Sequence, residues 1–501
     1  MAKPVSEVSM RKLLLVGIST FALGAGTVAL AEAARRAPKA ETYRMLELFG
    51  DVLATVEQQY VVPVDDKKLI QAAIDGMLTS LDPHSGYLDN ENFDDMRDQT
   101  RGEYGGLGLV VTTEDGAVKV VSPMDGTPAG RAGIQAGDYI TAIDGQSVVG
   151  LPLNDAVKQM RGAVGSIITL TIAREKQTPF QVKLTREVID VKSVTAKVEG
   201  DYGYIRIASF DEKTGRETRD AVRDLKTKLP KMKGLVLDLR NNPGGLVDSA
   251  VDVASAFLDG GEVVSQRGRD SKDIQRYNAR PNGDLLRGVP MVVIVNNGSA
   301  SASEIVAGAL KDRERASIVG LTSFGKGSVQ TVIPLRGGVD GALKLTTARY
   351  FTPSGQSIQK TGIIPELEVA RSKEEAQLVA DSATQFSEAS FRNALDAEEG
   401  KTRLAPHAPA EIPPEGFDIK KDDFQLNRAL DVLKTGGVQQ AIALRPQQKL
   451  AMATPKFTPG QPAGGVNPAT ASPPPASVVA PPALPQAAPV KPGAAAPAPK
   501  K

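Results

Sequence analysis

The spacing of apolar residues along the chain changes several times, and each change marks a different kind of element. Between residues 32 and 98 apolar side chains recur at helical spacing, as at Leu46, Phe49 and Leu53, which predicts amphipathic helices. Residues 99–186 instead contain short apolar runs separated by glycine turns, a pattern typical of β-strands. We therefore expect an N-terminal helical region, followed by a small β-rich module.

From residue 187 to residue 370, apolar runs of the buried-strand type alternate with amphipathic helical stretches. Residues 233–240 (KGLVLDLR) and 291–296 (MVVIVN) predict strands, and residues 246–258 (LVDSAVDVASAFL) predict a helix between them. Regular alternation of strand and helix is typical of a mainly parallel sheet covered by helices. The sequence therefore predicts an α/β core.

The N-terminal residues have the layout of an export signal. Arg11 and Lys12 precede an uncharged stretch from Leu13 to Ala31, which ends in the small-x-small pattern of a cleavage site. The stretch approaches the ~20 residues needed to span a bilayer, so an uncleaved anchor is the alternative. We expect residues 1–31 to be a signal peptide or a membrane anchor. The rest of the chain would then be exported, either periplasmic or anchored on the outer face of the cytoplasmic membrane.

The C-terminal part of the chain is more polar than the core. Residues 371–453 are rich in charge and contain one apolar helical segment at 424–433, so we expect a C-terminal helical region there. From Thr454 onward proline and alanine dominate. Such a composition cannot bury a core, and we expect residues 454–501 to be a disordered, extended tail.

Composition narrows the chemistry. The 501 residues are 41% hydrophobic and 24% charged, which is ordinary for a globular protein. Sixty basic residues face 59 acidic ones, so we expect no nucleic-acid partner. The chain has no cysteine, which excludes a thiol nucleophile and thiolate metal sites. Its only histidines are His84 and His407, so a hydrolytic site must use one of these two or find another base.

Residues 298–308 (GSASASEIVAG) follow a predicted strand and begin a predicted helix. Main-chain N–H groups at a helix start are unpaired and favour negative charge, which suits a nucleophile. The alternative is a capping box in which Ser301 and Glu304 satisfy those N–H groups, and on this window alone it is the commoner explanation. The window also leaves open whether Ser299, Ser301 or Ser303 would react.

A base for a serine stands downstream in SFGKGSVQ (residues 323–330). A serine hydroxyl needs an adjacent base, and a lysine can serve when burial lowers its pKa. Lys326 lies between two glycines and behind Phe324, where other groups could approach it closely. If the segment is extended, Lys326 and Gln330 share one face, and the amide could orient the amine. The alternative is an exposed surface lysine.

A third candidate element is DLRNNPGGL (residues 238–246), between a predicted strand and a predicted helix. Gly244 and Gly245 could expose main-chain N–H groups of the kind that stabilise an oxyanion. The alternative is a glycine-rich turn that serves geometry alone. The segment matches neither of the common phosphate-binding patterns.

Together these stretches resemble the carboxy-terminal (tail-specific) processing proteases, the Ser-Lys peptidases of family S41. The matching segments run in the family's order over residues 40–370: LDPHSGYL (81–88), YGGLGL (104–109), DLRNNPGG, NNGSASASEIVAGALKD, FGKGSVQ and LTTARYFTPSGQSIQ. The resemblance implies a ClpP/crotonase-like α/β core over 187–370, with a PDZ domain over 99–186 inserted ahead of it.

The resemblance also implies the catalytic roles. Ser301 would be the nucleophile, Lys326 the general base and Gln330 the group that orients the lysine, because the intervals 301–326 and 326–330 match the family's. Oxyanion donors would be Ala302 and one glycine of the pair 244–245, with Gly244 preferred. This chemistry needs no metal and no cofactor, and it does not use histidine.

In the β-rich module, the resemblance implies a carboxylate-binding loop, formed by Tyr104, Gly105, Gly106, Leu107, Gly108 and Leu109. A substrate's C-terminus would bind there and add as a strand to the sheet edge. Arg161 occupies the place of an arginine that links this module to activation in the family. His84, within the DPHS motif, is expected to stabilise a loop rather than act as a base.

The function implied is a serine endopeptidase that cleaves exported proteins at or near their C-termini. Its partners would be protein and peptide substrates with exposed C-termini, an adaptor protein and further copies of the chain in a homo-oligomer. An uncleaved N-terminal segment would add membrane association. The non-enzymatic alternative is an exported PDZ adaptor that captures C-termini, and a crotonase-like enzyme acting on acyl thioesters would not account for the Ser-Lys pair.

Overall fold

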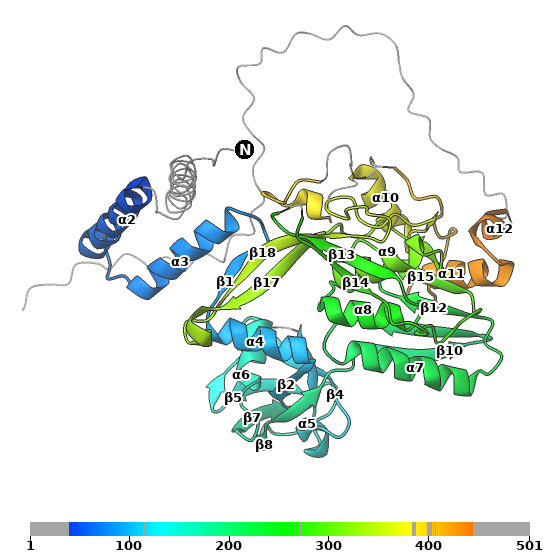
Figure 1. The fold of residues 1–501 in the computed structure, drawn as a ribbon. Coiled ribbons are helices and arrows are strands. Elements are labelled where there is room, and N and C mark those ends of the chain that lie inside the picture. Colours follow the sequence, from blue (N-terminus) through cyan, green and yellow to red (C-terminus); the bar gives the residue numbers. More distant parts are fainter. Residues whose placement is uncertain are drawn as a thin grey trace, which may run out of the picture. The chain divides into compact units, whose positions relative to one another are not determined.

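The computed structural model describes residues 40–114, 116–270, 272–382, 387–397, 403, 405 and 407–443. The predicted export signal and the predicted Pro/Ala-rich tail lie outside the described residues. The described residues all belong to one compact unit (Figure 1). Within the described part of the chain, no helix is both long and apolar enough to cross a membrane.

The N-terminal region is mainly helical, as the apolar spacing predicts. It contains α2 (Ala40–Gln59), α3 (Asp66–Thr79) and α4 (Asn90–Arg101). Between α3 and α4 lies a strand that the sequence does not reveal, β1 (Gly86–Leu88), because three residues are too few to show an alternating pattern. β1 pairs antiparallel with β18 (Ala342–Phe351), so it is tied to a sheet built from the far end of the core.

The β-rich module is an antiparallel sheet with two short helices. Its sheet order is β3 (Leu109–Glu114), β4 (Ala117–Pro123), β5 (Tyr139–Ile143), β7 (Ile167–Ala173) and β8 (Phe180–Thr185), with β6 (Gln146–Ser147) paired to β5. Its helices are α5 (Pro128–Arg131) and α6 (Leu153–Met160). Strand β3 is at the edge of the sheet. The ribbon of β2 (Glu103–Gly106) and β9 (Glu187–Asp190) closes the module at its entry and exit.

The core sheet confirms the α/β prediction. Its order is β10 (Val194–Glu199), β11 (Tyr202–Ile207), β12 (Gly234–Asp238), β15 (Met291–Val295), β16 (Ser317–Gly320) and β19 (Leu367–Glu368). The strands from β11 to β19 are parallel, and β10 is antiparallel at one edge. β12 and β15 are buried along their whole length, which is why their sequences are continuously apolar.

Helices cover both faces of this sheet (Figure 1). On one face pack α7 (Thr214–Lys228), α8 (Val247–Ser255) and α9 (Ala302–Asp312), against side chains such as Leu235 and Leu237. On the other face packs α11 (Phe424–Thr435), followed by α12 (Val438–Ala443), against Val236 and Ile294. The alternation of side chains along β12 therefore feeds two separate hydrophobic clusters.

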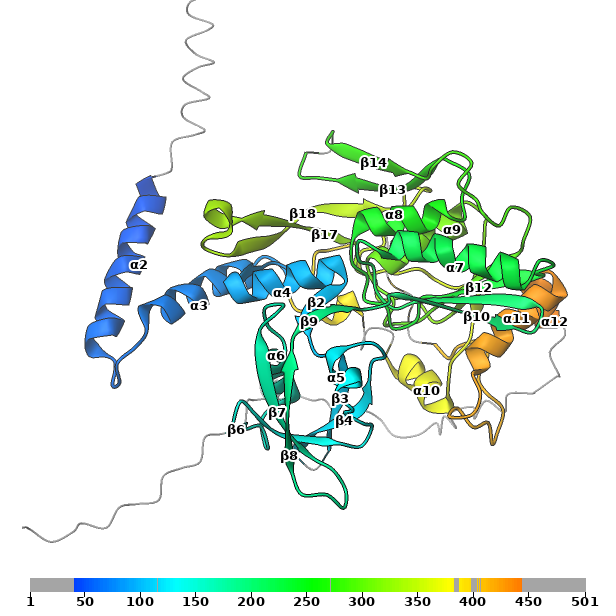
Figure 2. The same ribbon diagram turned by 90° about the horizontal axis from the view of Figure 1, so that it is seen from below.

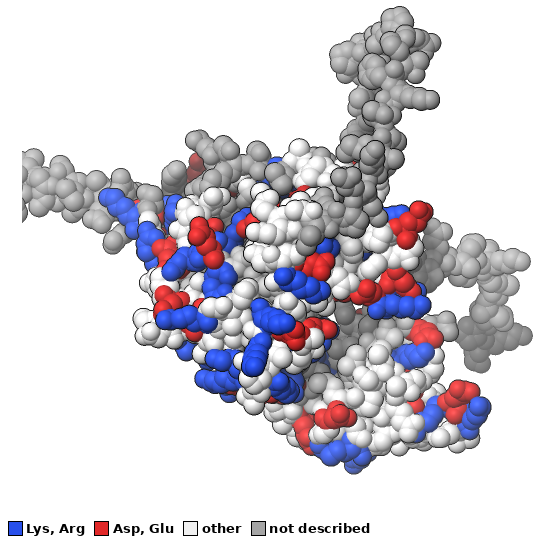
Figure 3. All heavy atoms as spheres, turned by 90° about the vertical axis from the view of Figure 1, so that its right-hand side faces the viewer, with Lys and Arg blue, Asp and Glu red and all other residues white. Residues whose placement is uncertain are grey.

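A second, antiparallel sheet joins β1, β18, β13 (Glu262–Arg267) and β14 (Ile274–Asn278), with β17 (Ser328–Pro334) also paired to β18 (Figure 2). A register shift between Val329 and Gln330 interrupts the pairing of β17 with β18. The remaining described helix of regular length, α10 (Lys373–Asp381), follows β19. On the face in Figure 3, basic and acidic side chains are interspersed, in keeping with the balanced composition.

Candidate active site

The candidate residues lie in loops that follow neighbouring parallel strands, where the carboxyl ends of the strands meet. β12 leads to Gly244, β15 leads to Ser301, and β16 leads to Lys326. The first two loops are in direct contact, since a side chain at Gly244 would lie 2.8 Å from Ser301 Cβ and 2.9 Å from Ala302 N. Only glycine fits there, and its positive φ of 102° is equally suited to glycine.

The three serines have different partners. Ser299 Oγ donates to Leu239 O at 2.8 Å, and Ser303 Oγ donates to Asn242 O at 2.9 Å, so both hydroxyls fasten the Ser301 loop to the loop after β12. In the described part of the chain, Ser301 Oγ donates to no main-chain oxygen. Of the three serine hydroxyls, that of Ser301 is therefore the one that does not fasten the loop to the main chain.

The backbone at Ser301 has the geometry of a sharp strand-to-helix turn. Its φ is 53° and its ψ is −113°, a combination that costs a residue other than glycine about 1–3 kcal/mol. The residue is only 6% exposed, and the buried phenol of Tyr350 interacts with its side chain. Burial, followed by the neighbouring Tyr277, raises the pKa of Tyr350, which keeps that phenol protonated.

Glu304 does much more than cap a helix. Its Oε2 accepts from Ser301 N at 2.8 Å, as the capping box predicts, and also from Lys326 N at 2.9 Å. Its Oε1 accepts from Gly325 N at 2.7 Å and from Ser323 Oγ at 2.5 Å. Burial raises the pKa of this fully buried carboxyl, while these hydrogen bonds oppose the rise. One carboxylate thus holds the backbones of Ser301 and Lys326 side by side.

Lys326 is half-buried and bonded to Gln330, and the shared face of the two residues predicts this contact. Its Nζ donates to Gln330 Oε1 at 2.5 Å. Burial, assisted by the positive charge of Lys344, lowers the pKa of Lys326 to about 8, against the opposing charges of Glu388, Glu304 and Asp82. No hydrogen bond joins Lys326 Nζ to Ser301 Oγ among the described residues, so Glu304 is what connects the two.

The two glycines of the loop after β12 differ in how their main-chain N–H groups are used. Gly244 N donates to Asn242 Oδ1 at 2.9 Å, so that N–H is already used. Within the described residues, Gly245 N and Ala302 N have no acceptor. Of the two glycines, Gly245 is therefore the one whose N–H is open to an oxyanion in this structure, although the sequence favoured Gly244, because the Asn242 side chain folds back onto Gly244 N.

Asparagines at the ends of two neighbouring strands fasten the loops together, and sequence reasoning missed them. Asn296 Oδ1 accepts from Asn241 N at 2.9 Å, and Asn296 Nδ2 donates to Asn241 Oδ1 at 2.8 Å. Asn242 Nδ2 donates to Ile207 O at 2.9 Å, while Asn242 O accepts from Ala300 N at 3.0 Å. The signal in the sequence was the repeated Asn-Asn at the end of two neighbouring strands.

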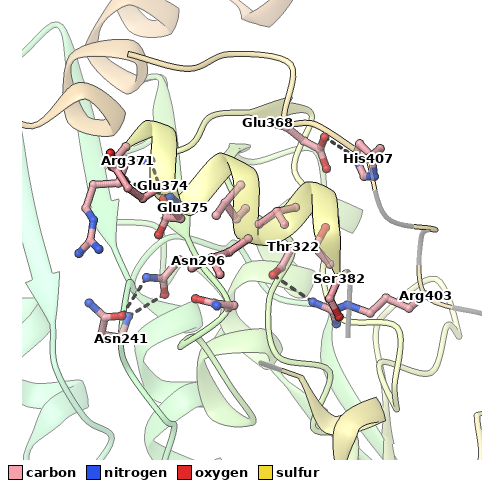
Figure 4. Close-up of a pocket in the computed structure, with 15 residues that line it drawn as sticks. Asn241, Asn296, Thr322, Glu368, Arg371, Glu374, Glu375, Ser382, Arg403 and His407 are labelled. Atoms are coloured by element: carbon pink, nitrogen blue, oxygen red, sulfur yellow. Dashed lines mark hydrogen bonds and ion pairs between the residues drawn. The ribbon is translucent and has the colours of Figure 1, made fainter. Parts of the chain in front are cut away.

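Neither histidine contacts Ser301 or Lys326 in the described part of the chain. His84 Nε2 lies 2.8 Å from Glu388 Oε2, and His407 Nε2 lies 2.7 Å from Glu368 Oε2. The hydrogen bonds of His407 to Ala405 O and Glu368 raise its pKa. His407 and Glu368 line a cavity of about 320 Å³ that also contains the Asn241–Asn296 pair (Figure 4).

The segment expected to bind a carboxylate is divided between two structures. Tyr104, Gly105 and Gly106 belong to strand β2, and Leu109 begins edge strand β3, so the turn between them is formed by Leu107 and Gly108. The Arg161 guanidinium lies 4.4 Å from the centre of the Tyr104 ring. Tyr104 and Arg161 line a cavity of about 410 Å³ together with Gly244 and Gly245.

Comparison with known proteins shows the family of the chain. Residues 201–369 match the model of peptidase family S41, residues 119–174 match a PDZ domain, and residues 24–92 match the activating protease CtpB N-terminal domain. The chain is 48% identical over 432 residues to the carboxy-terminal-processing protease of Bartonella bacilliformis, an alignment that covers 85% of this chain and 96% of that protein. The chain belongs to peptidase family S41.

Other S41 relatives are more distant. A "Probable CtpA-like serine protease" of Staphylococcus aureus is 39% identical over 347 residues, which cover 68% of each protein. Among solved structures, the photosystem II D1 C-terminal processing protease is 31% identical, with a TM-score of 0.39 and coverage of 67% of this chain and 97% of that one. The resemblance to S41 peptidases with a PDZ domain, inferred from the sequence motifs, is confirmed, as is the fold class.

Proposed function

We propose that this S41 peptidase is a serine endopeptidase in which Ser301 is the nucleophile and Lys326 the general base. The observation that carries the proposal is the shared carboxylate of Glu304, which holds a half-buried lysine of lowered pKa beside the one serine of the three whose hydroxyl does not donate to the main chain. Serine-lysine pairs follow the same logic as the serine-histidine-aspartate triad.

The reaction begins when neutral Lys326 Nζ accepts the Ser301 proton and Ser301 Oγ attacks the scissile carbonyl. The N–H groups of Ala302 and Gly245 then stabilise the oxyanion, and each donor of this kind typically contributes about 10²–10³ in rate. Protonated Lys326 gives its proton to the leaving amine. Water hydrolyses the acyl-enzyme, and the nucleophile is restored.

We further propose that the module holds the C-terminus of the substrate. Strand β3 is the edge strand of its sheet, so an extended peptide can add alongside it. Leu109 and Val111 on β3, and Leu153 and Val157 on α6, are partly buried and could receive an apolar terminal side chain. Arg161, in the cavity shared with the oxyanion glycines, would sense the bound peptide and regulate the site.

The proposed substrates are exported proteins with exposed, apolar C-termini, since the N-terminal residues have the layout of an export signal.

The test is an unstructured peptide that ends in two apolar residues and a free carboxylate, compared with the same peptide amidated at its C-terminus. We expect cleavage of the free-acid peptide to exceed that of the amidated one by about tenfold or more in kcat/KM, because the amide removes a charge-assisted contact. Mass spectrometry of the products locates the cut. An intact free-acid peptide would instead support the non-catalytic adaptor.

The charge of Lys344 sets part of the pH dependence. Its positive charge helps to lower the pKa of Lys326, so Lys344→Gln should raise that pKa above about 8. Lys326 acts as a base only when it is neutral, and a higher pKa means that it loses its proton at higher pH. The rising limb of kcat/KM should therefore move to higher pH. At pH 7 the loss should be less than about tenfold, the change that a full unit of pKa would produce. Lys344→Arg keeps the charge, and its profile should match that of the parent enzyme. Equal profiles for the Gln and Arg variants would contradict this account.

A further inference from the structure

The DPHS motif has no part in the mechanism above, yet its first residue is a buried charge. Asp82 is 3% exposed, and it lies in the loop between α3 and β1. Burial raises the pKa of this carboxyl, but hydrogen bonds from Ser85, His84 N and Thr346 outweigh that effect and leave the pKa lowered. Asp82 is therefore an ionised carboxylate, which can only accept hydrogen bonds.

A chain of hydrogen bonds leads from Asp82 to the base. Thr346 Oγ1 donates to Asp82 Oδ1 at 3.0 Å, and Gln330 Nε2 donates to Thr346 Oγ1 at 3.1 Å. At the other end of the same amide, Gln330 Oε1 accepts from Lys326 Nζ at 2.5 Å. Asp82, Thr346 and Gln330 thus form an unbroken relay behind Lys326.

The charge at Asp82 fixes the direction of every bond in this relay. A threonine hydroxyl has one proton, and because a carboxylate can only accept, Thr346 gives that proton to Asp82. The Thr346 oxygen must then accept, so the NH₂ end of Gln330 faces it and the carbonyl end faces Lys326. The neutral amine of Lys326 donates one N–H to the Gln330 carbonyl, and its lone pair is left to accept the Ser301 proton.

Strand register builds the relay from segments far apart in sequence. β1 pairs with β18 and β18 pairs with β17, which brings the loop of Asp82, Thr346 on β18 and Gln330 on β17 together. The register shift after Val329 leaves Thr347 without a partner residue and sets Gln330 opposite Thr346. Bulges next to active sites commonly re-aim a side chain in this way.

We propose that Asp82 and Thr346 are positioning residues of the base, which set the orientation of the Gln330 amide and through it the lone pair of Lys326. This inference rests on the proposed roles of Ser301 and Lys326. In this proposal the DPHS motif ensures that Lys326 donates to the Gln330 carbonyl and keeps its lone pair for Ser301.

The first test removes the Thr346 hydroxyl alone. Thr346→Val should lower kcat by roughly 10- to 100-fold, as loss of orientation at a reacting group typically does, with KM changed less than about twofold. Thr346→Ser restores the hydroxyl and should recover kcat to within about threefold.

The matched control is Thr347→Val. Thr347 is exposed, and its hydroxyl lies 2.6 Å from that of Thr331, away from Gln330, so its kcat should equal that of the parent. Thermal unfolding of each variant verifies that it is folded.

The second test uses the pH profile. The charged groups around Lys326 are Lys344 on β18, Glu304 on α9, Glu388 and Asp82, and the last raises the pKa of Lys326. In Asp82→Asn the neutral amide removes that charge and can donate to Thr346, which lets Gln330 turn its NH₂ toward the lysine. We expect a lower plateau of kcat together with a rising limb moved to lower pH. A purely structural role would loosen the burial of Lys326 and move the limb to higher pH.

The outcomes separate this inference from the proposed function. If Thr346→Val and Thr347→Val share the parent's kcat while Ser301→Ala is inactive, the relay is wrong and the Ser-Lys mechanism stands. A limb moved to higher pH in Asp82→Asn would also overturn the relay. If Ser301→Ala cleaves like the parent, the proposed function fails first.

Discussion

Replacement of Ser301 by alanine is expected to lower kcat by about 10⁴- to 10⁶-fold, the range typical of losing a catalytic nucleophile. The change removes the proposed nucleophilic hydroxyl, while the Glu304 contact to the main-chain N–H of residue 301 does not depend on the side chain. Single-turnover cleavage of the free-acid peptide measures the rate. Trapping at low pH, followed by mass spectrometry, tests for the acyl-enzyme, which should form on the parent chain and not on Ser301→Ala.

The neighbouring serines are matched controls. Ser299→Ala and Ser303→Ala each remove a hydrogen bond that fastens the loop, which should cost about 1 kcal/mol of unfolding free energy. Both variants should keep kcat within about tenfold of the parent, because neither hydroxyl reacts. An inactive Ser303→Ala beside an active Ser301→Ala would show that the wrong serine had been chosen.

Replacement of Lys326 by methionine should have the second largest effect, a loss of about 10²–10⁴ in kcat, the usual contribution of a general base. With a pKa of about 8, Lys326 is mostly protonated at pH 7, so kcat/KM of the parent should rise nearly tenfold per pH unit up to about pH 8 and then level off. The methionine variant should lose that rise together with the amine. A variant profile that still rises through pH 8 would assign the base to another group.

Lys326→Arg separates the base from its charge. Arginine keeps a positive charge at this position but cannot be deprotonated in a protein, so it cannot accept the Ser301 proton. We expect it to be as inactive as the methionine variant over the whole pH range. Substantial activity in Lys326→Arg would mean that the site needs a cation at residue 326 rather than a base.

The parallel sheet could be predicted because its central strands are buried on both faces, which gives runs such as MVVIV a continuously apolar sequence. The antiparallel sheet could not be predicted in the same way. Strand β1 is three residues long, and its partner β18 lies more than 250 residues later in the chain (from Leu88 to Ala342). Strands so far apart in the chain can pair only after the core between them has folded, so no local pattern of apolar residues predicts the pairing.

The candidate site was predictable at the level of motifs and less so at the level of atoms. The choice of Ser301 among the three serines came from the family's intervals between Ser301, Lys326 and Gln330, since nothing physical in the sequence alone separates three alternating serines as nucleophiles. Which of Gly244 and Gly245 has an N–H open to an oxyanion depends on which way the Asn242 side chain turns. Three of the four contacts of Glu304 depend on how the loop after β16 packs, so from sequence this residue looked like an ordinary helix cap.

The pairing of β1 with β18 has a consequence for the order in which the enzyme becomes active during synthesis. Asp82 emerges from the ribosome early and Thr346 late, with the whole module translated between them. Domains generally fold as they emerge, so the module can fold while the relay still lacks two of its strands. The nucleophile loop is also made before β18. Every strand except β19 is thus made by the time β18 can pair, and under the proposed mechanism a nascent chain stays without an aligned Lys326 until its core is nearly complete.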